Sequence, residues 1–319
     1  MKKASKLILI MSWMLWMSTQ LFAQSSTAYS IDSIEERIKA QESSIPDLKK
    51  DNNATITWAK EQGVATDLVL VYLHGFGASR MEAEPVISKL AEEFEANVFY
   101  ARLKGHGRSG VKGFEELTKE NYLDSAEEAL KAGRLLGKKI VLISTSTGGT
   151  LSLHLASKHE DIAGLLLYSP FVGLRNPMMA QITTPKGREM FKSMIGGEVQ
   201  NMKRPEPESK YWSTQYHINA YVALIGMLKE TMTPETFKAV TCPVFMAYYY
   251  KNEEEQDKVV SVQAMLDMYD QLGTPSDLKQ KQAFPETGNH VIASELRSKD
   301  WTSVLEASQT FIQHNILKP

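Results

Sequence analysis

One stretch constrains this chain more than any other, the run from Ile140 to Thr150. Four apolar residues, Ile-Val-Leu-Ile, lead into the small residues Ser-Thr-Ser-Thr-Gly-Gly. Apolar residues at helical spacing then continue from Leu151 to Ala156. The pattern predicts a buried strand, a sharp turn with Ser146 at its apex and a helix that begins directly after this serine.

A serine at such an apex is typical of a nucleophile elbow, in which a strained backbone presents the hydroxyl for reaction. The usual motif is G-x-S-x-G, but Ser144 stands at the first glycine position and Gly148 at the second. Small residues are needed there because the strand and the helix approach closely, and serine is small enough. The Ser144 hydroxyl is either merely tolerated or points at the site and adjusts the surroundings of Ser146. The alternative for the whole stretch is an ordinary Ser/Thr-rich loop.

Strand and helix patterns alternate on both sides of this unit. Several apolar runs show no polar alternation, which favours strands that are buried on both faces of a parallel sheet. The expected strands cover residues 54–58 at an edge, 67–73, 97–101, 140–143, 161–168, 243–250 and 278–284. The expected helices cover residues 82–95, 120–136, 261–272 and 300–316. The fold class is therefore α/β, a mostly parallel central sheet flanked by helices.

The alternation breaks between residues 171 and 239, where methionines, aromatic residues and prolines accumulate. We expect this segment to be an inserted, mainly helical cap, with residues 54–170 and 240–319 forming the core. The methionines either contact apolar groups of varied shape or simply pack the cap on the core. Residues 24–53 are expected to form an N-terminal arm with one short amphipathic helix and a disordered N-terminal end.

Residues 1–23 have the three parts of a secretory signal peptide: a basic head, a short apolar middle and a small residue, Ala23, at the cut. The apolar run is shorter than the about 20 residues that span a membrane. An uncleaved N-terminal anchor is the alternative. We expect an exported protein, periplasmic or extracellular, with no stable membrane span after cleavage.

The charge and the cysteine content of the chain limit the classes of partner and the covalent cross-links that we expect. The chain has 36 Lys and Arg against 38 Asp and Glu, and loss of three lysines with the leader gives a net charge of −5. No basic surface for nucleic acid is expected from such a chain. The single cysteine, Cys242, excludes an intramolecular disulfide, and its apolar neighbours indicate a core residue. The sequence shows neither a metal-ligand spacing nor a nucleotide-binding loop, so no metal and no cofactor are predicted.

A serine hydroxyl needs a base to take its proton and a carboxylate to orient that base. In enzymes with this strand–turn–helix unit, the chain order is serine, acid, histidine. Of the seven histidines, His290 follows the last expected strand in a turn-rich loop before a helix. We predict that His290 is the base, the alternative being a histidine of a surface loop.

The acid is expected after the preceding strand, between Lys251 and Asp257. Asp257 comes where the chain turns back to the apolar Val259 and Val260, and we predict that it is the acid. The acidic run 253–255 remains the alternative, although such charge runs are usually solvated.

Attack on a carbonyl creates an oxyanion, which needs preorganised N–H donors. Thr147 follows the nucleophile and offers its N–H from the start of the helix. The second donor is expected from the glycine-rich loop after an early strand, and we choose Phe76 in this loop. The glycines also fit a tight turn that needs backbone freedom, and both roles are compatible.

Together these segments resemble the α/β-hydrolase superfamily, in the branch of monoacylglycerol lipases, carboxylesterases and serine aminopeptidase-like hydrolases. The matching segments are residues 72–77, 103–109, 144–149, 257–260 and 290–292. They follow one another in the order of the family. The resemblance implies an α/β-hydrolase fold with a lid between the sixth and seventh strands, which agrees with the expected cap at residues 171–239.

The first hypothesis is a secreted serine hydrolase that cleaves small acyl esters, as a carboxylesterase or monoacylglycerol lipase-like enzyme, through an acyl-enzyme. An amidase or aminopeptidase with the same triad is the alternative. It needs a carboxylate to bind a substrate amine, for example Glu206 or Glu208 of the cap. A catalytically silent binding protein on the same fold is the hypothesis from another class, and it predicts a broken triad. The sequence determines neither the natural ester nor the oligomeric state.

Overall fold

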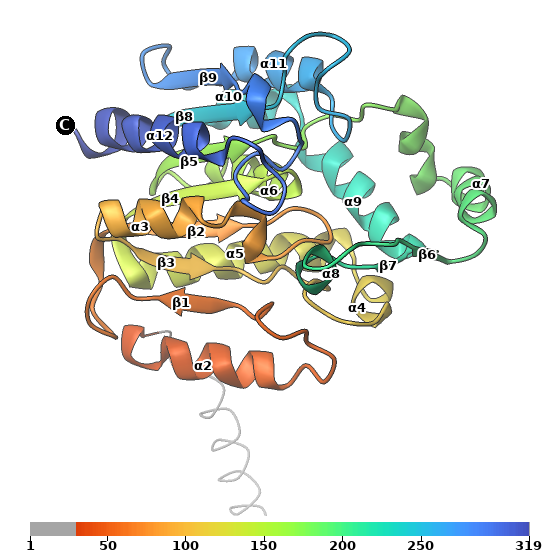
Figure 1. The fold of residues 1–319 in the computed structure, drawn as a ribbon, viewed down its shortest axis with the longest axis horizontal. Helices are drawn as coiled ribbons and strands as arrows, with labels where there is room; N and C mark the ends of the chain where they lie inside the picture. Colours follow the sequence, from red (N-terminus) through yellow and green to blue (C-terminus); the bar gives the residue numbers. More distant parts are fainter. Residues whose placement is uncertain (1–29, 319) are drawn as a thin grey trace, which may run out of the picture.

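The computed structural model describes residues 30–318, so the predicted signal peptide and the start of the arm lie outside the described residues. A seven-stranded sheet with the order β1-β3-β2-β4-β5-β8-β9 forms its centre (Figure 1). The strands are β1 Thr55–Thr57, β2 Thr66–Leu73, β3 Asn97–Tyr100, β4 Gly137–Thr145, β5 Ile162–Tyr168, β8 Val244–Tyr248 and β9 Lys279–Ala283. The edge strand β1 pairs antiparallel with β3, and all other neighbours are parallel. The predicted mostly parallel sheet is confirmed.

The continuous apolar runs are explained by burial on both faces of the sheet. In β2, Val69 and Val71 belong to one hydrophobic core, whereas Leu70 and Tyr72 belong to the other. Successive side chains of a strand point to opposite faces, so both faces need apolar residues when both are covered.

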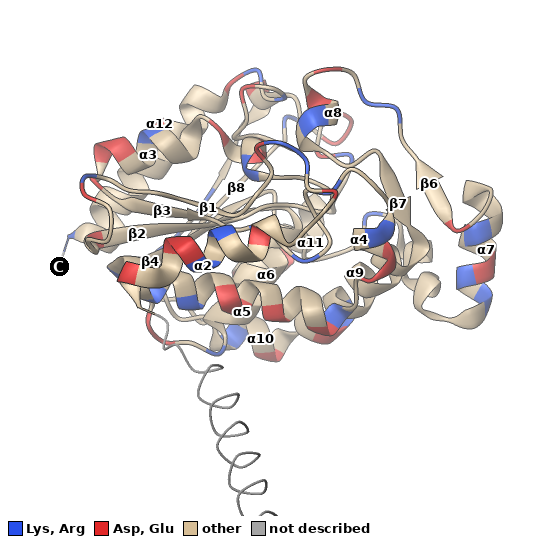
Figure 2. Ribbon diagram, turned by 90° about the horizontal axis from the view of Figure 1, so that it is seen from below, with Lys and Arg blue, Asp and Glu red and all other residues tan. Residues whose placement is uncertain are grey.

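Helices cover both faces (Figure 2). The first core contains side chains of α2 Ile31–Ser43, α5 Lys119–Leu136, α6 Thr147–Ala156, α9 Ile218–Thr231, α10 Pro234–Ala239 and α11 Val262–Gln271. The second core contains side chains of α3 Val86–Glu93 and α12 Trp301–Phe311, which continues as a π-helical turn over Ile312–Leu317. Short segments complete the core region, namely η1 Arg80–Ala83, α4 Lys112–Glu115 and η3 Pro285–Thr287.

The helix expected over residues 82–95 is divided into η1 and α3. Glu84 between them has extended backbone angles, φ −92° and ψ 139°. It precedes Pro85, and a residue before proline is disfavoured in the helical region because of the proline ring. Pro85 is then the N-cap of α3. As an α-helix, the expected helix therefore begins four residues late, at Val86.

The segment between β5 and β8 is a mixed insertion. It contains η2 Pro177–Thr183, α7 Pro185–Ile195, β6 Val199–Asn201, α8 Glu208–Tyr211, β7 Gln215–His217, α9 and α10. The antiparallel pair β6–β7 is an element that the sequence patterns do not predict. In the described residues, the insertion follows the fifth strand of the main sheet in chain order, where the resemblance counts six.

Helices α9 and α7 hold different positions in the insertion. Helix α9 packs on α4 and α5 of the core, and α10 packs on α6 and α11. Helix α7 stands away from the core (Figure 1) and packs on η2 and α9. The insertion is therefore anchored through α9 and α10 and projects through α7.

The described part of the chain contains no helix that combines the length and the apolar character of a membrane span. Figure 2 shows both signs of charge on α2, α5 and α7, without a face of one sign on these helices.

Candidate active site

Ser146 follows the last residue of β4 and is the N-cap of α6. Its backbone angles are φ 53° and ψ −116°, a region that residues other than glycine rarely adopt. Hydrogen bonds hold this conformation: the Ser146 N–H donates to Tyr168 O at 2.9 Å, and its carbonyl accepts from Gly149 and Phe171 N–H at 2.8 Å each. The turn predicted at Ser146 is therefore a sharp, strained strand–helix junction.

Behind this turn, helix α6 approaches strand β2 most closely at Gly148. A Cβ atom at this position would lie 1.9 Å from the carbonyl oxygen of Leu73, so no other residue fits without a shift of the backbone. Ser144 meets no such limit, because it is an ordinary residue of β4 in register with Leu73 and Leu167. Its hydroxyl is buried and finds no partner within residues 30–318, and Ser144 does not line the cavity that Ser146 lines. Ser144 is thus a tolerated small residue.

The structure brings Asp257 and His290 together. Asp257 Oδ2 lies 2.5 Å from His290 Nδ1, and their side chains are 0% and 9% exposed. Asp257 Oδ1 accepts the N–H groups of Val259 at 2.7 Å and Val260 at 3.0 Å. The carboxylate is therefore fixed by its own loop and holds one nitrogen of the imidazole, which leaves Nε2 for the cavity.

Burial and charge act in opposite directions on this pair. Burial disfavours both ions, yet the imidazole of His290 lowers the pKa of Asp257 below its ordinary value. For the same reason the pKa of His290 is raised, because the attraction of the Asp257 carboxylate outweighs the burial that lowers it. Each partner favours the charged form of the other.

The acidic run 253–255 lies in an exposed turn. Asn252 Oδ1 accepts the N–H groups of Glu254 and Glu255 at 3.0 and 2.8 Å, and Glu253 accepts the hydroxyl of Tyr250 at 3.0 Å. These carboxylates are directed into the loop itself and to solvent. Asp257, not the run, lies against His290.

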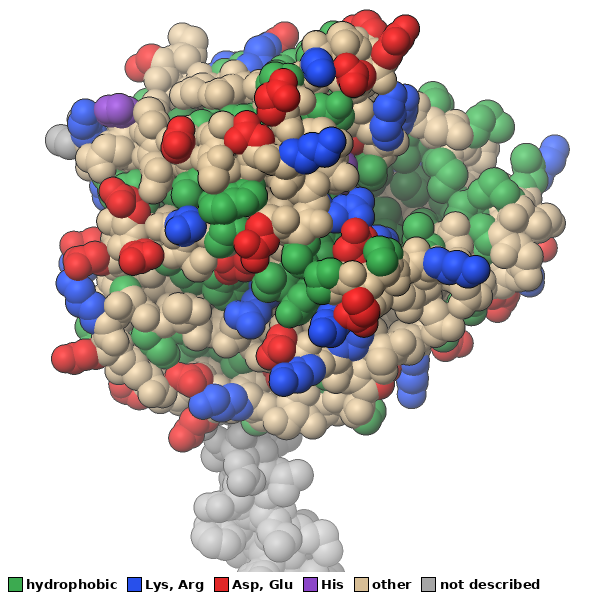
Figure 3. Space-filling model, viewed as in Figure 1, with side chains coloured by type: hydrophobic (Ala, Val, Ile, Leu, Met, Phe, Trp, Pro, Cys, Tyr) green, Lys and Arg blue, Asp and Glu red, His purple; other side chains and the backbone are tan. Residues whose placement is uncertain are grey.

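A cavity of about 710 Å³ is lined by four of the five predicted site residues, whereas Asp257 lies behind His290 and does not line it. Ser146, Thr147, His290 and Phe76 all line it, together with residues of the insertion and of the loops after β5 and β8. Figure 3 shows a hollow at this end of the sheet with hydrophobic side chains around it. The Ser146 hydroxyl makes no hydrogen bond within the described residues, and catalytic hydrogen bonds of this kind often close only with substrate.

The two predicted oxyanion donors are both available. The N–H groups of Phe76 and Thr147 have no hydrogen-bond partner among residues 30–318, and both residues line the cavity. Thr147 is the first residue of α6, so its N–H also lies at the positive end of the helix dipole.

Two early histidines are structural. His74 Nε2 accepts Leu103 N–H at 3.1 Å, its Nδ1 lies 2.9 Å from Gly75 O, and its ring lies 5.0 Å from that of His106. Burial lowers the pKa of His74 to about 4 and that of His106 well below its ordinary value. Both rings are therefore neutral and connect the two glycine-rich loops beneath Phe76, whose ring lies 5.8 Å from His106.

Glu82 is a site residue that sequence reasoning did not find. It is 3% exposed, lines the cavity, and accepts the N–H of Gly75 through Oε2 at 2.5 Å. Burial raises its pKa to about 7, although the Gly75 N–H and the nearby His290 favour the carboxylate. Glu82 thus fixes the residue that precedes the predicted donor Phe76.

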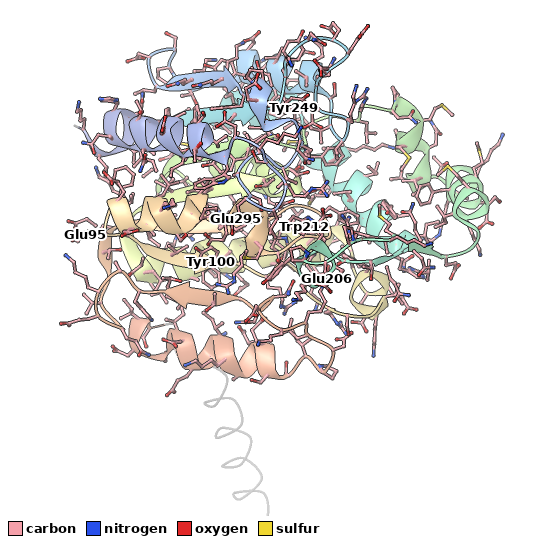
Figure 4. The ribbon with its side chains drawn as sticks, in the orientation of Figure 1. Glu95, Tyr100, Glu206, Trp212, Tyr249 and Glu295 are labelled. Carbon is pink, nitrogen blue, oxygen red and sulfur yellow. The ribbon has the colours of Figure 1, made fainter. Side chains whose placement is uncertain are left out.

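Trp212 and Tyr249 also escaped prediction. Both line the cavity, Trp212 directly after α8 and Tyr249 directly after β8. Figure 4 shows Tyr249 near β8 and Trp212 near α8. No motif marks either residue, because their positions depend on how the insertion and the loop after β8 fold over the core.

The raised pKa of Glu82 leads us to expect a pH-dependent difference in stability between the wild type and Glu82→Gln. Its unfolded pKa is near 4.5 and its folded pKa near 7, so the folded protein retains a proton that the unfolded chain loses between these values. Stability from this group is complete below pH 4.5 and is lost as the pH rises to 7. Glu82→Gln keeps an oxygen for Gly75 N–H but never ionises. It should unfold like the wild type at pH 4.5 and be more stable at pH 8, by up to about 3 kcal/mol.

Urea denaturation of both proteins at the two pH values measures this difference. Glu93→Gln, an exposed substitution on α3, is the control and should show no such change between pH 4.5 and 8. An equal stability of Glu82→Gln and wild type at pH 8 would mean that Glu82 ionises without cost in the folded protein.

Sequence comparison decides the family. The profile of the family described as "Serine aminopeptidase, S33" matches residues 65–241, more than half of the chain. The chain belongs to this family. The S33 match includes Phe76, Ser146 and Thr147 and ends before Asp257 and His290. The roles of these last two residues therefore rest on the geometry.

Relatives of known structure share the fold of this S33 member, and the α/β-hydrolase fold expected from the resemblance is confirmed. A structure from work on LipS and LipT, two metagenome-derived lipolytic enzymes, has a TM-score of 0.65 at 17% identity and covers 83% of this chain and 99% of its own. A soluble variant of monoglyceride lipase from Saccharomyces cerevisiae has a TM-score of 0.63 at 13% identity, with coverages of 83% and 92%.

A thermostable monoacylglycerol lipase of Bacillus sp. (strain H-257) is 29% identical over 133 residues. The aligned part covers 41% of this S33 chain and 52% of that lipase, about half the length of the relative.

Proposed function

We propose that this chain is a serine hydrolase that cleaves carboxylic esters through an acyl-enzyme. The observation that carries the proposal is that one cavity is lined both by Ser146, which has a strained backbone, and by His290, which is bound to Asp257 at 2.5 Å. A serine that is presented by a strained turn, with an imidazole in the same cavity that is held by a buried carboxylate, fits acyl transfer.

In this mechanism, Ser146 Oγ attacks the ester carbonyl while Nε2 of His290 takes its proton. Asp257 holds the imidazole in the required tautomer and stabilises the imidazolium that forms. The N–H groups of Phe76 and Thr147 stabilise the oxyanion. His290 then gives the proton to the departing alcohol, and a water molecule activated by the same imidazole releases the acid from the acyl-enzyme.

The cavity favours esters over substrates with a free amine. Glu206, one candidate for binding an amine, is 66% exposed and does not line the cavity (Figure 4). Glu208, the other, lies 2.6 Å from Arg297 and is already neutralised. Among the described lining residues, the remaining carboxyl is Glu82, which is buried against Gly75. The lipolytic relatives point in the same direction.

A silent binding protein is the less favoured alternative. It predicts a broken triad, whereas Ser146, Asp257 and His290 are all present, and the serine retains a strained backbone. Strain of this kind is maintained at functional sites and has no evident use in a simple turn.

The insertion at residues 171–239 acts as a cap in this proposal. Met179, Tyr221, Leu224 and Ile225 line the cavity from its side and offer an apolar surface to an acyl chain. We also propose export after cleavage behind Ala23, which N-terminal sequencing of the mature protein would show as a start at Gln24.

A substrate panel tests the reaction. p-Nitrophenyl esters with acyl chains from acetate to palmitate are assayed beside the 2-naphthylamides of leucine and proline. We expect turnover of the esters and none of the amides above background. Turnover of the amides alone would contradict the proposed ester hydrolysis and favour the aminopeptidase.

A further inference from the structure

The lining of the active-site cavity is more positive than the chain as a whole. The chain has a formal net charge of −2. Yet four cationic residues line the cavity, Arg175, Arg204, Lys258 and Arg297. Among the described lining residues, the one with a carboxyl group is the buried Glu82. Figure 3 shows blue side chains at the rim of the hollow. A lining opposite in sign to the chain indicates attraction of a negatively charged ligand.

These four cations differ in their partners. Arg297 Nη1 and Arg204 Nη1 lie 2.6 and 3.9 Å from the same Glu208 carboxylate, which balances part of their charge. Arg175 Nη1 donates to the backbone oxygen of Asp257 at 2.8 Å, and Lys258 Nζ donates to a backbone oxygen of the preceding turn. Neither Arg175 nor Lys258 forms an ion pair within residues 30–318.

The backbone places these two unbalanced cations on the same side of the cavity. Leu174 pairs with Val260 in an antiparallel bridge, so the segment that ends in Arg175 runs beside the segment that carries Lys258. The hydrogen bond from Arg175 to Asp257 O joins the two segments again. Both cations therefore stand beside the loop that holds His290 in place.

We propose that Arg175 and Lys258 form a subsite for an anionic group of the ester substrate, a carboxylate on either its acyl or its alcohol part. The inference rests on the proposed ester hydrolysis and specifies its substrate class. A purely neutral ester that covered these cations would take them from water without a partner, which is unfavourable, whereas a carboxylate compensates them. The apolar residues of the cap side, such as Leu224 and Ile225, would then contact the uncharged remainder.

Matched ester pairs test the subsite. Monoethyl adipate is compared with ethyl hexanoate for an anion on the acyl part, and 4-carboxyphenyl butyrate with 4-acetylphenyl butyrate for an anion on the alcohol part. We expect kcat/KM of the anionic member to exceed that of its neutral partner by about tenfold in one pair at low ionic strength. The preference should fall as salt is added, because these cations are solvent-exposed.

Variants assign the preference to these residues. Lys258→Gln and Arg175→Gln should each lower the anionic-to-neutral ratio by about threefold, and Arg175→Lys should retain it. Lys251→Gln is the matched control, since Lys251 pairs with Glu255 and does not line the cavity, and it should keep the wild-type ratio. Equal rates in both ester pairs would overturn the subsite while leaving ester hydrolysis intact. Failure to hydrolyse any of the four esters would instead overturn the proposed function.

Discussion

Replacing Ser146 by alanine is expected to lower kcat for p-nitrophenyl butyrate by about 10⁴-fold or more, while the folded structure is kept. The reason is that, in the proposed mechanism, the hydroxyl is the attacking group, and the remaining N–H donors and binding contacts would supply only a fraction of the rate. The substituted residue keeps its backbone, which is held by Tyr168 O, Gly149 N–H and Phe171 N–H. Thermal unfolding measured beside the kinetics checks that the variant is folded.

Ser144→Ala is the matched control for this experiment. Ser144 lies two residues away in β4, is fully buried and carries a hydroxyl without a partner in the described part of the chain. Because this hydroxyl does not line the cavity, its loss should leave kcat within a factor of about two. An equal loss of activity in both variants would mean that the elbow is sensitive to packing and that Ser146 has no special role.

Replacing Asp257 by asparagine has the second largest expected effect, a fall of kcat of about 10³ to 10⁴-fold. Asparagine keeps an oxygen for the Val259 and Val260 N–H groups, so the loop is retained. It cannot, however, accept the Nδ1–H of His290 in the required tautomer or stabilise the imidazolium. In Asp257→Asn, the loop conformation should therefore be kept while the support of His290 is lost.

The pH dependence of kcat/KM distinguishes a loss of the proposed catalytic role in Asp257→Asn from a structural defect. The proposed base, His290, could accept a proton only when neutral, and the Asp257 carboxylate raises its pKa in the wild type. Without the carboxylate, burial lowers this pKa, so the acid limb of kcat/KM should move to lower pH while the maximum falls. Glu254→Gln, in the exposed acidic turn, should change neither the rate nor the profile. A larger loss in Glu254→Gln than in Asp257→Asn would make the acidic run the acid.

Most of the core was predictable from the sequence because its signals are local. The apolar run from Leu68 to Leu73, after Asp67, favours a strand that is buried on both faces, and β2 covers the expected residues 67–73 with one added residue. The small residues around Ser146 reflect a close approach that the chain itself imposes, as Gly148 shows. The proximity of Asp257 and His290, predicted from chain order, is present in the structure, although they are 33 residues apart.

The parts that escaped prediction depend on contacts between distant segments. Glu82 lies in a segment with ordinary helical spacing, where a glutamate is normally exposed, and only the fold shows that it is buried against Gly75. The β6–β7 pair is formed by strands of three residues each, too short for a period to be recognised. Arg175 and Lys258 lie on adjacent segments only because Leu174 and Val260 pair in an antiparallel bridge on one side of the cavity.

The most direct test of the central claim is covalent labelling of the wild-type protein with a fluorophosphonate, read by intact mass and by peptide mapping. We expect one adduct per chain, on Ser146, formed faster as His290 becomes neutral and absent from Ser146→Ala. Failure of the folded wild type to label, or an equal adduct on Ser146→Ala, would contradict the assignment of Ser146 as the nucleophile.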